Sequence, residues 1–358
     1  MRLMRKDEML RFIADRRHVF DAEAQNNPFA SSAWLVHFIE QVAASDWTFI
    51  IAESALDPGA FMLLYRTSER PQRALAIANY YASLYSPVVG VDIASSRTTE
   101  VVRDLRRVSP TIATVDLSPL DGHERQTIDL CRSFSRAGWY ARRYFCFGNW
   151  FLPSQNLTFE DYMAARPSQL RNTWTRKAKR FDGGSARLEL VTSGGRAADG
   201  IDAFRQVYGK SWKKPEPYPD FVPGWAKICS ENGWLRLGIA WLDDQPIAVQ
   251  FWFTRSRRAY IFKLAYDEKY AKLSAGTVLT AFMIRHSLEQ DQVVEIDYLT
   301  GDDVYKRDWM AARRERVGVR ACYLGNVRGI AMAAVEAIGA GKKLLHRASG
   351  RQAEQTGR

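Results

Sequence analysis

Residues able to carry acid–base chemistry gather in one short segment of this 358-residue chain. Residues 297–309 read DYLTGDDVYKRDW and bring Tyr305 within a few positions of Asp297 and Asp302. Transfer of an acyl group from a thioester to an amine needs an acid that protonates the departing thiolate and a group that takes the amine proton. We predict Tyr305 as the acid and Asp297 or Asp302 as the proton relay, with water as an alternative base.

The same segment also has a purely structural interpretation. Asp302 and Asp303 belong to the residue types that begin helices, because a carboxylate oxygen accepts hydrogen bonds from the first free backbone N–H groups. Tyr305 and Trp309 can then pack beneath a sheet. For the two aspartates taken in isolation, this interpretation is as well founded as the catalytic one.

A loop of small residues precedes the predicted helix upstream of that segment. Backbone N–H groups and the positive end of the helix dipole bind phosphates at a helix start, and glycine lets a ligand approach the backbone closely. The loop therefore predicts a phosphate site, and an ordinary helix cap is the alternative. The residues assigned to this site are Lys272, Ser274, Ala275, Gly276 and Thr277.

Periodicity predicts the elements that hold these residues. An apolar stripe at helical spacing predicts a helix after the loop. The stripe consists of Val278, Leu279, Phe282, Met283 and His286. The two-residue period of the next strand places Glu295 and Asp297 on one face. Three strands joined by hairpins precede the loop. They are expected over residues 234–243, 245–255 and 258–267, with turns at 243–246 and 255–258.

The two halves of the chain share an order of elements, which suggests a diverged duplication. In the first half, strands are expected over 47–54, 59–67 and 74–83, followed by the turn YSPVV. A helix at 33–43 in the first half corresponds to one at 202–212 in the second. Such meanders followed by a helix and a further strand indicate a mixed α/β sheet.

The domain boundaries follow from this organisation. We expect domains over 1–170 and 171–325, followed by a basic C-terminal helix and tail over 326–358. Residues 213–224 contain four prolines and cannot form a continuous helix. They predict a loop that shapes substrate entry.

The composition is that of a globular protein with a strong positive charge. Hydrophobic residues make up 46% of the chain, and 51 Lys+Arg against 40 Asp+Glu leave a net charge of +11. This excess favours an anionic partner, such as a phosphorylated cofactor, a nucleic acid or a membrane surface. The densest basic run covers 171–181, where the solvated face of a connecting helix is the commoner interpretation. A second basic piece covers 341–351.

Cysteine and histidine spacing argues against a metal site. The four cysteines form no CxxC pair, and the five histidines form no paired ligand pattern. Charged residues interrupt the first 20 positions, which is untypical of a signal peptide or a membrane anchor. We therefore expect a cytoplasmic protein without a metal.

Four segments carry a resemblance to a known family. They are KSWKK at 210–214, QPIAVQFWF at 245–253, KLAYDEKYAKLSAG at 263–276 and DYLTGDDVYKRDW at 297–309, the last being the most specific. With them, residues 174–323 resemble the GNAT superfamily of acyltransferases, specifically the CelD-like branch related to the Fem aminoacyl ligases of peptidoglycan synthesis. The first half, through NPFASSAWL at 27–35 and the YYASLYSPVV turn, resembles the degenerate N-terminal copy of that group.

The resemblance implies an α/β fold of tandem GNAT-like mixed sheets flanked by helices. It also implies that the backbone of Lys263, Leu264 and Ala265 bonds the pantetheine arm of the donor. The small-residue loop would receive the pyrophosphate, and of the family's loop pattern only Gly276 matches. Tyr305 falls where many members keep the tyrosine that protonates the thiolate. The residues assigned to the acceptor are Trp212, Gln250, Tyr266 and Lys306.

Three functions follow as hypotheses. The first is an N-acyltransferase that uses acyl-CoA or an acyl-carrier-protein thioester and a small-molecule or glycan-precursor amine, such as an amino sugar for polysaccharide or envelope synthesis. The second is a Fem-like aminoacyltransferase that uses aminoacyl-tRNA, gripped by the basic residues 176–180. In that case the basic C-terminal helix could meet an anionic membrane surface. The third is a non-catalytic nucleic-acid or scaffold module.

Overall fold

The computed structural model describes residues 3–55, 59–90, 95–123 and 125–339. The chain forms two compact units. Unit 1 comprises Met1–Glu23, Ala44–Cys146 and Arg316–Arg358, and unit 2 comprises Ala24–Ala43 and Phe147–Glu315. These limits differ from the contiguous domains expected from the sequence, because two long strands, β6 (Trp139–Pro153) and β13 (Ala312–Tyr323), each begin in one unit and end in the other.

Unit 2 contains a mixed sheet in the order β6–β12–β11–β10–β9–β8–β7. Its other strands are β7 (Asp182–Gly183), β8 (Ala186–Val191), β9 (Leu235–Leu242), β10 (Gln245–Arg255), β11 (Arg258–Tyr266) and β12 (Glu295–Asp297). All neighbours are antiparallel except β11 and β12, which run parallel. Parallel neighbours need a crossover connection, and the helix α10 (Ala275–Glu289) supplies it.

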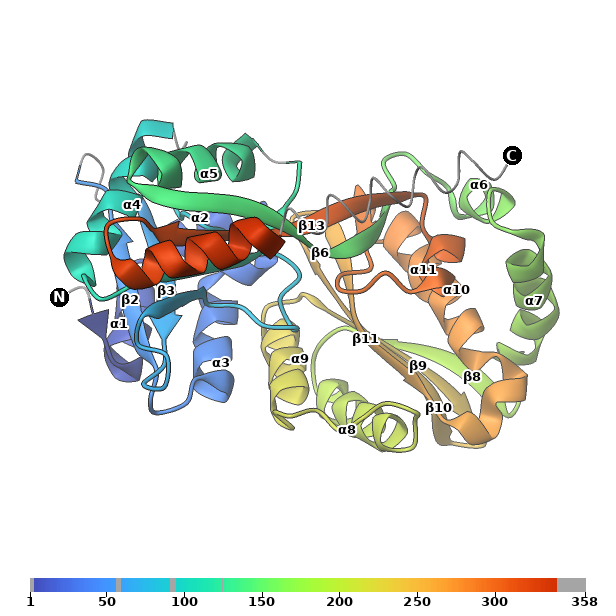
Figure 1. Ribbon diagram of the computed structural model, residues 1–358. Coiled ribbons are helices and arrows are strands. Elements are labelled where there is room, and N and C mark those ends of the chain that lie inside the picture. Colours follow the sequence, from blue (N-terminus) through green and yellow to red (C-terminus); the bar gives the residue numbers. More distant parts are fainter. Residues whose placement is uncertain (1–2, 56–58, 91–94, 124, 340–358) are drawn as a thin grey trace, which may run out of the picture. The chain divides into compact units, whose positions relative to one another are not determined.

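Helices cover both faces of this sheet. Helix α10 packs on one face, and α8 (Arg196–Gly209) and α9 (Phe221–Glu231) lie on the other (Figure 1). Helices α6 (Phe159–Ala164) and α7 (Ser168–Ala178) pack beside α10, whereas α3 (Ser32–Val42) packs on α9. The remaining short helices of unit 2 are η1 (Pro28–Ala30), η2 (Lys179–Phe181), η3 (Glu268–Leu273) and α11 (Val304–Trp309).

The expected strands and hairpins of unit 2 are confirmed. Asp243 and Asp244 have φ of 47° and 62°, and Ser256 and Arg257 have φ of 49° and 56°. Two successive residues with positive φ form the tight hairpin turn whose twist matches that of the flanking strands. The stripe on α10 is also confirmed, because Val278, Leu279 and Met283 are buried in the core with Trp252 and Ile296.

Three sequence-based limits differ from the structure. The strand expected over 74–83 ends at Ala76, and Asn79 accepts a hydrogen bond from the backbone N–H of Tyr81 in a turn. The helix expected over 202–212 starts earlier and ends at Gly209. The proline-rich loop ends at Asp220, since α9 begins with Phe221 and tolerates a proline in its first turn.

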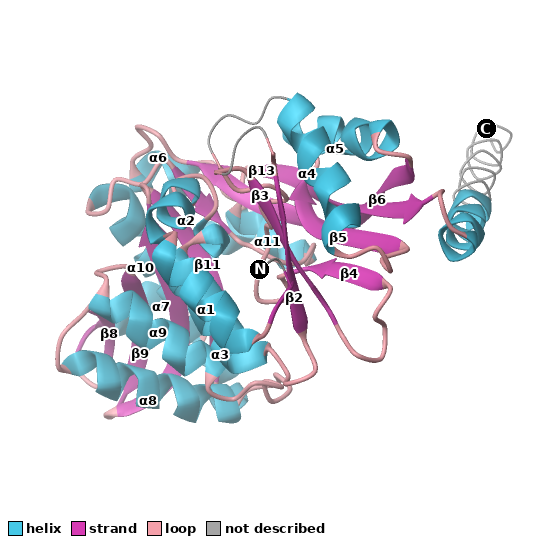
Figure 2. Ribbon diagram, turned by 90° about the vertical axis from the view of Figure 1, so that its left-hand side faces the viewer, coloured by secondary structure: helices cyan, strands magenta, loops and turns pink. Residues whose placement is uncertain are grey.

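Unit 1 contains the strand order β1–β2–β3–β4–β5–β13. Its elements are β1 (Leu3–Met4), α1 (Lys6–Asp15), α2 (Arg17–Glu23), β2 (Thr48–Glu53), β3 (Phe61–Arg66), β4 (Arg73–Ala76), α4 (Ser95–Val108), β5 (Thr114–Asp121) and α5 (Arg125–Arg136). Helices α4 and α5 lie side by side, and α4 packs against β2 (Figure 2). Residues 327–339 form a further helix after β13.

The same order of elements occurs in both units. Unit 1 runs β1, α1, α2, β2, β3, β4, α4, β5, and unit 2 runs β8, α8, α9, β9, β10, β11, α10, β12. In each, the two strands joined by the crossover helix are parallel. The expected equivalence of the helices at 33–43 and 202–212 is wrong, however, because α3 belongs to unit 2 and the counterparts of α8 and α9 are α1 and α2.

The two units differ where their parallel strands diverge. In unit 1, β4 ends at Ala76, and the segment that follows occupies the place beside β3 and β5. Tyr85 donates its backbone N–H to the carbonyl of Pro119 on β5, its hydroxyl donates to the carbonyl of Leu63 on β3, and Val89 bridges to Phe61. This gap is therefore filled by the chain itself.

Candidate active site

In unit 2, β11 and β12 pair only at their first residues. The register joins Arg258–Tyr260 with Glu295–Asp297, after which β12 ends and β11 continues to Tyr266. Among the described residues, no strand pairs with this side of β11 beyond Tyr260. Lys263, Leu264 and Ala265, assigned to the pantetheine arm, lie on this stretch. An extended amide chain can therefore run beside Leu264 and Ala265, where β12 no longer continues.

The start of α10 follows directly from this strand through η3. Ser274 has the left-handed conformation, φ 54°, and no side chain among the described residues caps the helix. A helix leaves its first N–H groups without intrahelical partners, so this start can receive an anion. A Cβ placed on Gly276 would lie 3.7 Å from the Tyr266 ring, which is ordinary contact. Glycine is therefore not required here by packing.

The exposed Lys272 and a second lysine lie beside this helix start. The ammonium of Lys177, on α7, donates a hydrogen bond to the carbonyl of Lys272 over 2.8 Å. The basic run at 171–181 is helical, as expected, and none of the residues of α7 is buried. The structure thus brings part of that run to the predicted phosphate loop, a proximity that the sequence did not indicate.

Tyr305 is the exposed phenol of the predicted constellation. It lies on α11, and 43% of its surface is exposed. Its ring meets the buried Tyr298 ring edge-on at 5.8 Å between centroids, and the Tyr298 hydroxyl donates to it. Burial of the phenol and the nearby Asp303 carboxylate raise the pKa of Tyr305 to about 12. The phenol is therefore protonated throughout the physiological range and available as a proton donor.

Lys306 organises the turn before Tyr305. Its ammonium, buried to 4% exposure, donates to the carbonyls of Thr300 (2.6 Å) and Gly301 (3.2 Å) and pairs with Asp303 at 3.2 Å. Burial lowers the pKa of Lys306, and Asp303 opposes this effect. These contacts favour a structural role over the predicted contact with the acceptor.

Both aspartates proposed as relays have their oxygens engaged. Asp302 accepts from the Trp150 indole at 2.8 Å and pairs with Arg313 at 2.6 Å; the Arg313 hydrogen bond lowers the pKa of Asp302. The buried Asp297 accepts from Asn149 (2.6 Å), the backbone of Leu299 (2.7 Å) and Arg314 (2.5 Å).

Arg314 also binds Glu295, which confirms that Glu295 and Asp297 share a face of β12. A carboxylate that is already paired with a guanidinium is a weaker base. Together, the contacts of Asp297 and Asp302 favour positioning over proton transfer.

The proline-rich loop contributes a group of charges. Lys263 on β11 lies 2.5 Å from Glu216 of the loop, and the exposed Trp212 ring contacts Tyr266 at a 45° tilt, with 4.6 Å between the ring centroids. Lys213 forms no ion pair with any described residue. Burial lowers the pKa of Lys213, and the nearby charge of Lys263 lowers it further. The loop therefore brings a half-buried cation close to β11, and the Glu216 and Asp303 carboxylates oppose the lowering of its pKa.

The other two residues assigned to the acceptor lie differently. Tyr266 is half-buried between Trp212 and the start of α10. Gln250 is 2% exposed, and its amide donates to Thr280 and to the carbonyl of Gly276 while accepting from the Trp252 indole. Its bonds fasten β10 to the first turn of α10, which leaves no group for a substrate.

Lys213 and Glu216 were missed by sequence reasoning. Only the ordering of the loop against β11 gives them a position, and a stretch with so many prolines has no periodicity from which to predict it.

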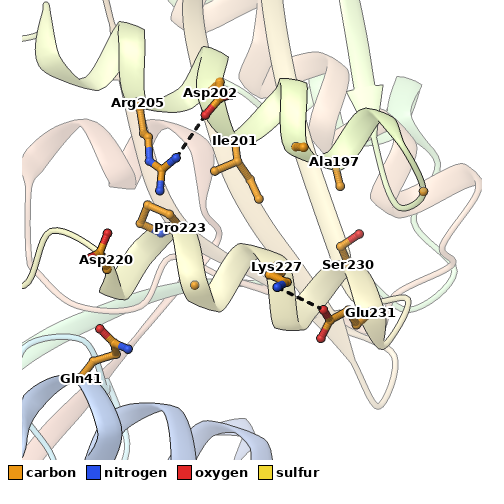
Figure 3. A pocket seen from close by; sticks show the side chains of 13 residues that line it. Gln41, Ala197, Ile201, Asp202, Arg205, Asp220, Pro223, Lys227, Ser230 and Glu231 are labelled. Atoms are coloured by element: carbon orange, nitrogen blue, oxygen red, sulfur yellow. Dashed lines mark hydrogen bonds and ion pairs between the residues drawn. The ribbon is translucent and has the colours of Figure 1, made fainter.

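A hollow between α8 and α9 has a different character (Figure 3). Its volume is about 620 Å³. Four of its five charged residues pair along their own helices, Arg205 with Asp202 at 3.1 Å and Lys227 with Glu231 at 4.0 Å. Such pairs at three- and four-residue spacing are typical of solvated helix faces. None of the predicted site residues lines it.

The described residues contain neither a cluster of metal ligands nor a helix that could span a membrane. Within residues 3–55, 59–90, 95–123 and 125–339, no three His, Cys, Asp or Glu side chains are grouped so as to hold a metal ion. In the same described part, no helix has both the length and the apolar character to cross a bilayer.

Comparison with known proteins identifies the domain type. Residues 168–307, which make up most of unit 2, match the model of the acetyltransferase (GNAT) domain. FemX has a similar solved structure, with a TM-score of 0.59 at 9% identity over 90% of this chain and 98% of that one. The C-terminal domain of a putative lysylphosphatidylglycerol synthetase from Agrobacterium fabrum gives 0.53 at 13% identity over 94% and 96%.

L-PGS from Bacillus licheniformis gives a TM-score of 0.51 at 12% identity, covering 88% of this chain and 95% of that one. At these identities the likeness concerns the fold alone. No curated protein matches the chain.

Proposed function

We propose that this chain is an N-acyltransferase that moves an acyl group from a thioester donor, acyl-CoA or an acyl-carrier protein, to an amine. The observation that carries the proposal is the arrangement in unit 2, where β11 continues past its last pairing with β12 and leads to the start of α10, which no side chain among the described residues caps. An extended, phosphorylated donor arm suits such a path. The GNAT-type domain at 168–307 supports an acyltransferase reaction.

The proposed reaction balances as follows. The amine nitrogen attacks the thioester carbonyl carbon, so a C–N bond forms and the C–S bond breaks. The amine gives its proton to water or to another base, and the departing thiolate takes a proton from Tyr305. The Tyr298 hydroxyl, which donates to Tyr305, stabilises the resulting phenolate until solvent returns the proton.

The aspartates and Lys213 take secondary roles in this proposal. Asp297 and Asp302 hold the backbone around Tyr305 through Arg314 and Arg313. Lys213 offers a positive charge to the acceptor, which favours an amine that also carries a carboxylate or phosphate. An amino sugar precursor for polysaccharide or envelope synthesis, as in the CelD-like branch, fits this requirement. The cytoplasmic location remains a prediction from the sequence.

A second candidate uses aminoacyl-tRNA as the donor. It is supported by the basic face of α7, where Arg176 and Lys177 lie next to the loop at the start of α10. Binding of RNA through several phosphates would fall steeply with salt, whereas binding of acyl-CoA would fall less. Filter binding with tRNA at two salt concentrations separates the two donors. A non-catalytic module remains a third alternative, which any turnover would exclude.

The helix at residues 327–339 supports a contact between this chain and an anionic membrane surface. Its exposed face is apolar, with Val327 83% exposed and Val335 and Ile338 each 61% exposed. The basic residues at 341–351 follow in the sequence and lie outside the described residues. An apolar helix face with adjoining lysines and arginines binds anionic lipid.

Flotation with phosphatidylglycerol vesicles checks the membrane contact. Val335→Glu with Ile338→Glu should abolish binding, whereas Arg328→Gln should leave most of it. Equal flotation of the three proteins would contradict this contact.

Tyr305→Phe tests the main proposal. Loss of a general acid lowers kcat by about 10²- to 10⁴-fold. Donor affinity should change less than twofold, because the phenol lies on α11 and not at the start of α10. An aryl thioester, whose thiolate leaves without protonation, should restore most of the rate.

The outcome against the proposal is equally specific. Unchanged turnover, or a parallel loss of turnover and donor binding, would remove Tyr305 from the role of acid. Asp303→Asn is the matched control, because it changes the charge next to Tyr305 and leaves the phenol in place.

A further inference from the structure

A pocket beside the first turns of α1 takes part in none of the functions above. Its volume is about 760 Å³, and sites for small molecules usually measure about 300 to 1,000 Å³. Its walls come from residues between 3 and 11, from residues 45–48 at the start of β2, and from Ser68 after β3. All of these residues belong to unit 1, so the pocket is complete within that unit.

One wall of the pocket is an aromatic ring held in a fixed orientation. Phe49 pairs with Tyr65 across β2 and β3, and Trp47 lies two positions before Phe49, which places it diagonally opposite Tyr65 on the same face. The two rings stack with 3.6 Å between centroids and 8° between their planes. Tyr65 therefore covers one face of the indole, and the half-buried remainder of Trp47 borders the pocket.

The first turns of α1 bring charges of both signs to the pocket. Asp7 and Arg11 both line it and are exposed. They are four positions apart, a spacing at which opposite charges commonly pair on a helix. Neither of them forms an ion pair with any described residue. Both side chains can therefore bond to a ligand.

Two further carboxylates of the pocket are held in place by local hydrogen bonds. Glu8 accepts from the backbone N–H of Arg5 at 2.8 Å. Asp46 accepts from the backbone N–H and from the hydroxyl of Ser68, at 3.3 Å each. A carboxylate can accept about four hydrogen bonds, so each of the two keeps acceptor positions for a ligand.

The charge of the lining indicates which ligands suit it. Three carboxylates stand against two guanidiniums, those of Asp7, Glu8 and Asp46 against Arg5 and Arg11, in a chain whose net charge is +11. A phosphorylated ligand would meet more like charge than opposite charge, which disfavours nucleotides and nucleic acid. An apolar ligand would take water from charged groups without replacing its hydrogen bonds. A ring with several hydroxyls and an amino group avoids both costs.

We propose that this pocket binds an amino sugar unit of a glycan, with the sugar ring on the indole of Trp47 and the ammonium toward Asp7 and Asp46. The C–H groups on one side of a pyranose form an apolar face that packs on an aromatic ring. The hydroxyls at its edge donate to carboxylates and accept from guanidiniums, and Ser45 and Thr48 add hydroxyls to the wall. The pocket holds the glycan without acylating it, since the proposed reaction belongs to unit 2.

The probe is the glucosamine trimer of chitosan, titrated calorimetrically into the full chain without an acyl donor. Trp47→Leu keeps an apolar side chain and removes the flat ring, whereas Asp7→Ala removes one exposed carboxylate. Each should weaken binding by about fivefold or more. Asp15→Ala is the matched control, because it makes the same change as Asp7→Ala on the same helix outside the pocket. It should bind like the wild type.

Two further measurements test the orientation and the charge of the sugar. Saturation transfer from the protein should be strongest at the ring C–H protons on one side of the sugar and should be lost in Trp47→Leu. The fully N-acetylated trimer lacks the ammonium groups and should bind more weakly than the glucosamine trimer. Equal or tighter binding of the N-acetylated trimer overturns the assignment of an amino sugar.

Three other results also overturn the proposal. They are no saturable binding of the glucosamine trimer, wild-type affinity in Trp47→Leu, and equal weakening in Asp7→Ala and Asp15→Ala. If the melting temperature shows that Trp47→Leu does not fold, the comparison of Asp7→Ala with Asp15→Ala decides. Because no acyl donor is present, a failure of the proposed transferase reaction leaves this result unchanged, and failed glycan binding leaves that reaction unaffected.

Discussion

Gly276→Asp, at the start of α10, should weaken donor binding without lowering the stability of the fold. The first turn of this helix has no acidic residue and no capping side chain among the described residues. A carboxylate there interacts favourably with the helix dipole, by about 0.3 to 1 kcal/mol. Replacing helical glycine adds up to about 1 kcal/mol. The variant should therefore be as stable as the wild type or more so.

The same carboxylate should repel the phosphates of the donor. Two unit charges 5 Å apart interact by about 3 kcal/mol at an effective dielectric constant of 20. Because the loop is partly solvated, we expect about 1 to 3 kcal/mol, which corresponds to about a 5- to 150-fold rise in Kd. Gly276→Ala is the control, since its Cβ would lie 3.7 Å from Tyr266 and should alter binding little.

Calorimetric Kd for the donor and the melting temperature of each variant provide the assay. The expected pattern is a melting temperature maintained or raised in both variants and weaker binding in Gly276→Asp alone. Donor binding that is equal in Gly276→Asp and Gly276→Ala would refute the placement of phosphates at this helix start. A loss of stability in Gly276→Asp would refute the description of the first turn as uncapped.

Three further predictions concern single groups around the site. Glu216→Gln removes the carboxylate that pairs with the half-buried Lys263 and should lower the free energy of unfolding by about 2 to 3 kcal/mol. Urea denaturation measures this loss. Adding Lys263→Met to the same chain should restore part of it, because no unpaired ammonium is then left. Arg313 lowers the pKa of Asp302 in the folded state below the value of about 4 that Asp302 has in the unfolded chain. The pair therefore stabilises the fold fully above pH 4, and this stabilisation is lost as the pH falls through the pKa of Asp302 in the folded state. The difference in unfolding free energy between wild type and Asp302→Asn should then be constant from about pH 7 to 5 and shrink below about pH 4. A difference that grows on acidification would contradict a lowered pKa of Asp302. Since the pKa of Tyr305 is raised to about 12, kcat should show no loss from its deprotonation below about pH 11, and an alkaline limb near pH 9 that is absent in Tyr305→Phe would argue otherwise.

The sequence predicted the elements of unit 2 because local signals agree there with the fold. The hairpin turns, the α10 stripe and the alternation along β12 all depend on residues close in sequence. The sequence did not predict in this way that each unit is built from separate segments of the chain. It depends on β6 and β13, whose pairing partners lie far away in the chain, and nothing in their own periodicity marks the point where each strand changes unit.

The site shows the same limit at the level of side chains. Tyr305 and Gly276 could be proposed from the sequence because each has a recognisable neighbourhood in it. The ion pair between Asp302 and Arg313 and the hydrogen bond from Gln250 to Thr280 could not be predicted from the sequence, because each joins residues from different elements. Residue type alone cannot distinguish a carboxylate that is free to act as a base from one that is already paired with a guanidinium.

The comparison between units explains why one copy is the better candidate for catalysis. Both units place a crossover helix between two parallel strands, so both could in principle open a gap. In unit 1 the segment with Tyr85 and Val89 bonds to the neighbouring strands and occupies that gap with backbone. In unit 2 the chain instead turns at once through η3 into α10, and β12 pairs only with the first three residues of β11. The proposal of a donor arm in unit 2 thus depends on the connection that follows the strand, which is where the two copies differ.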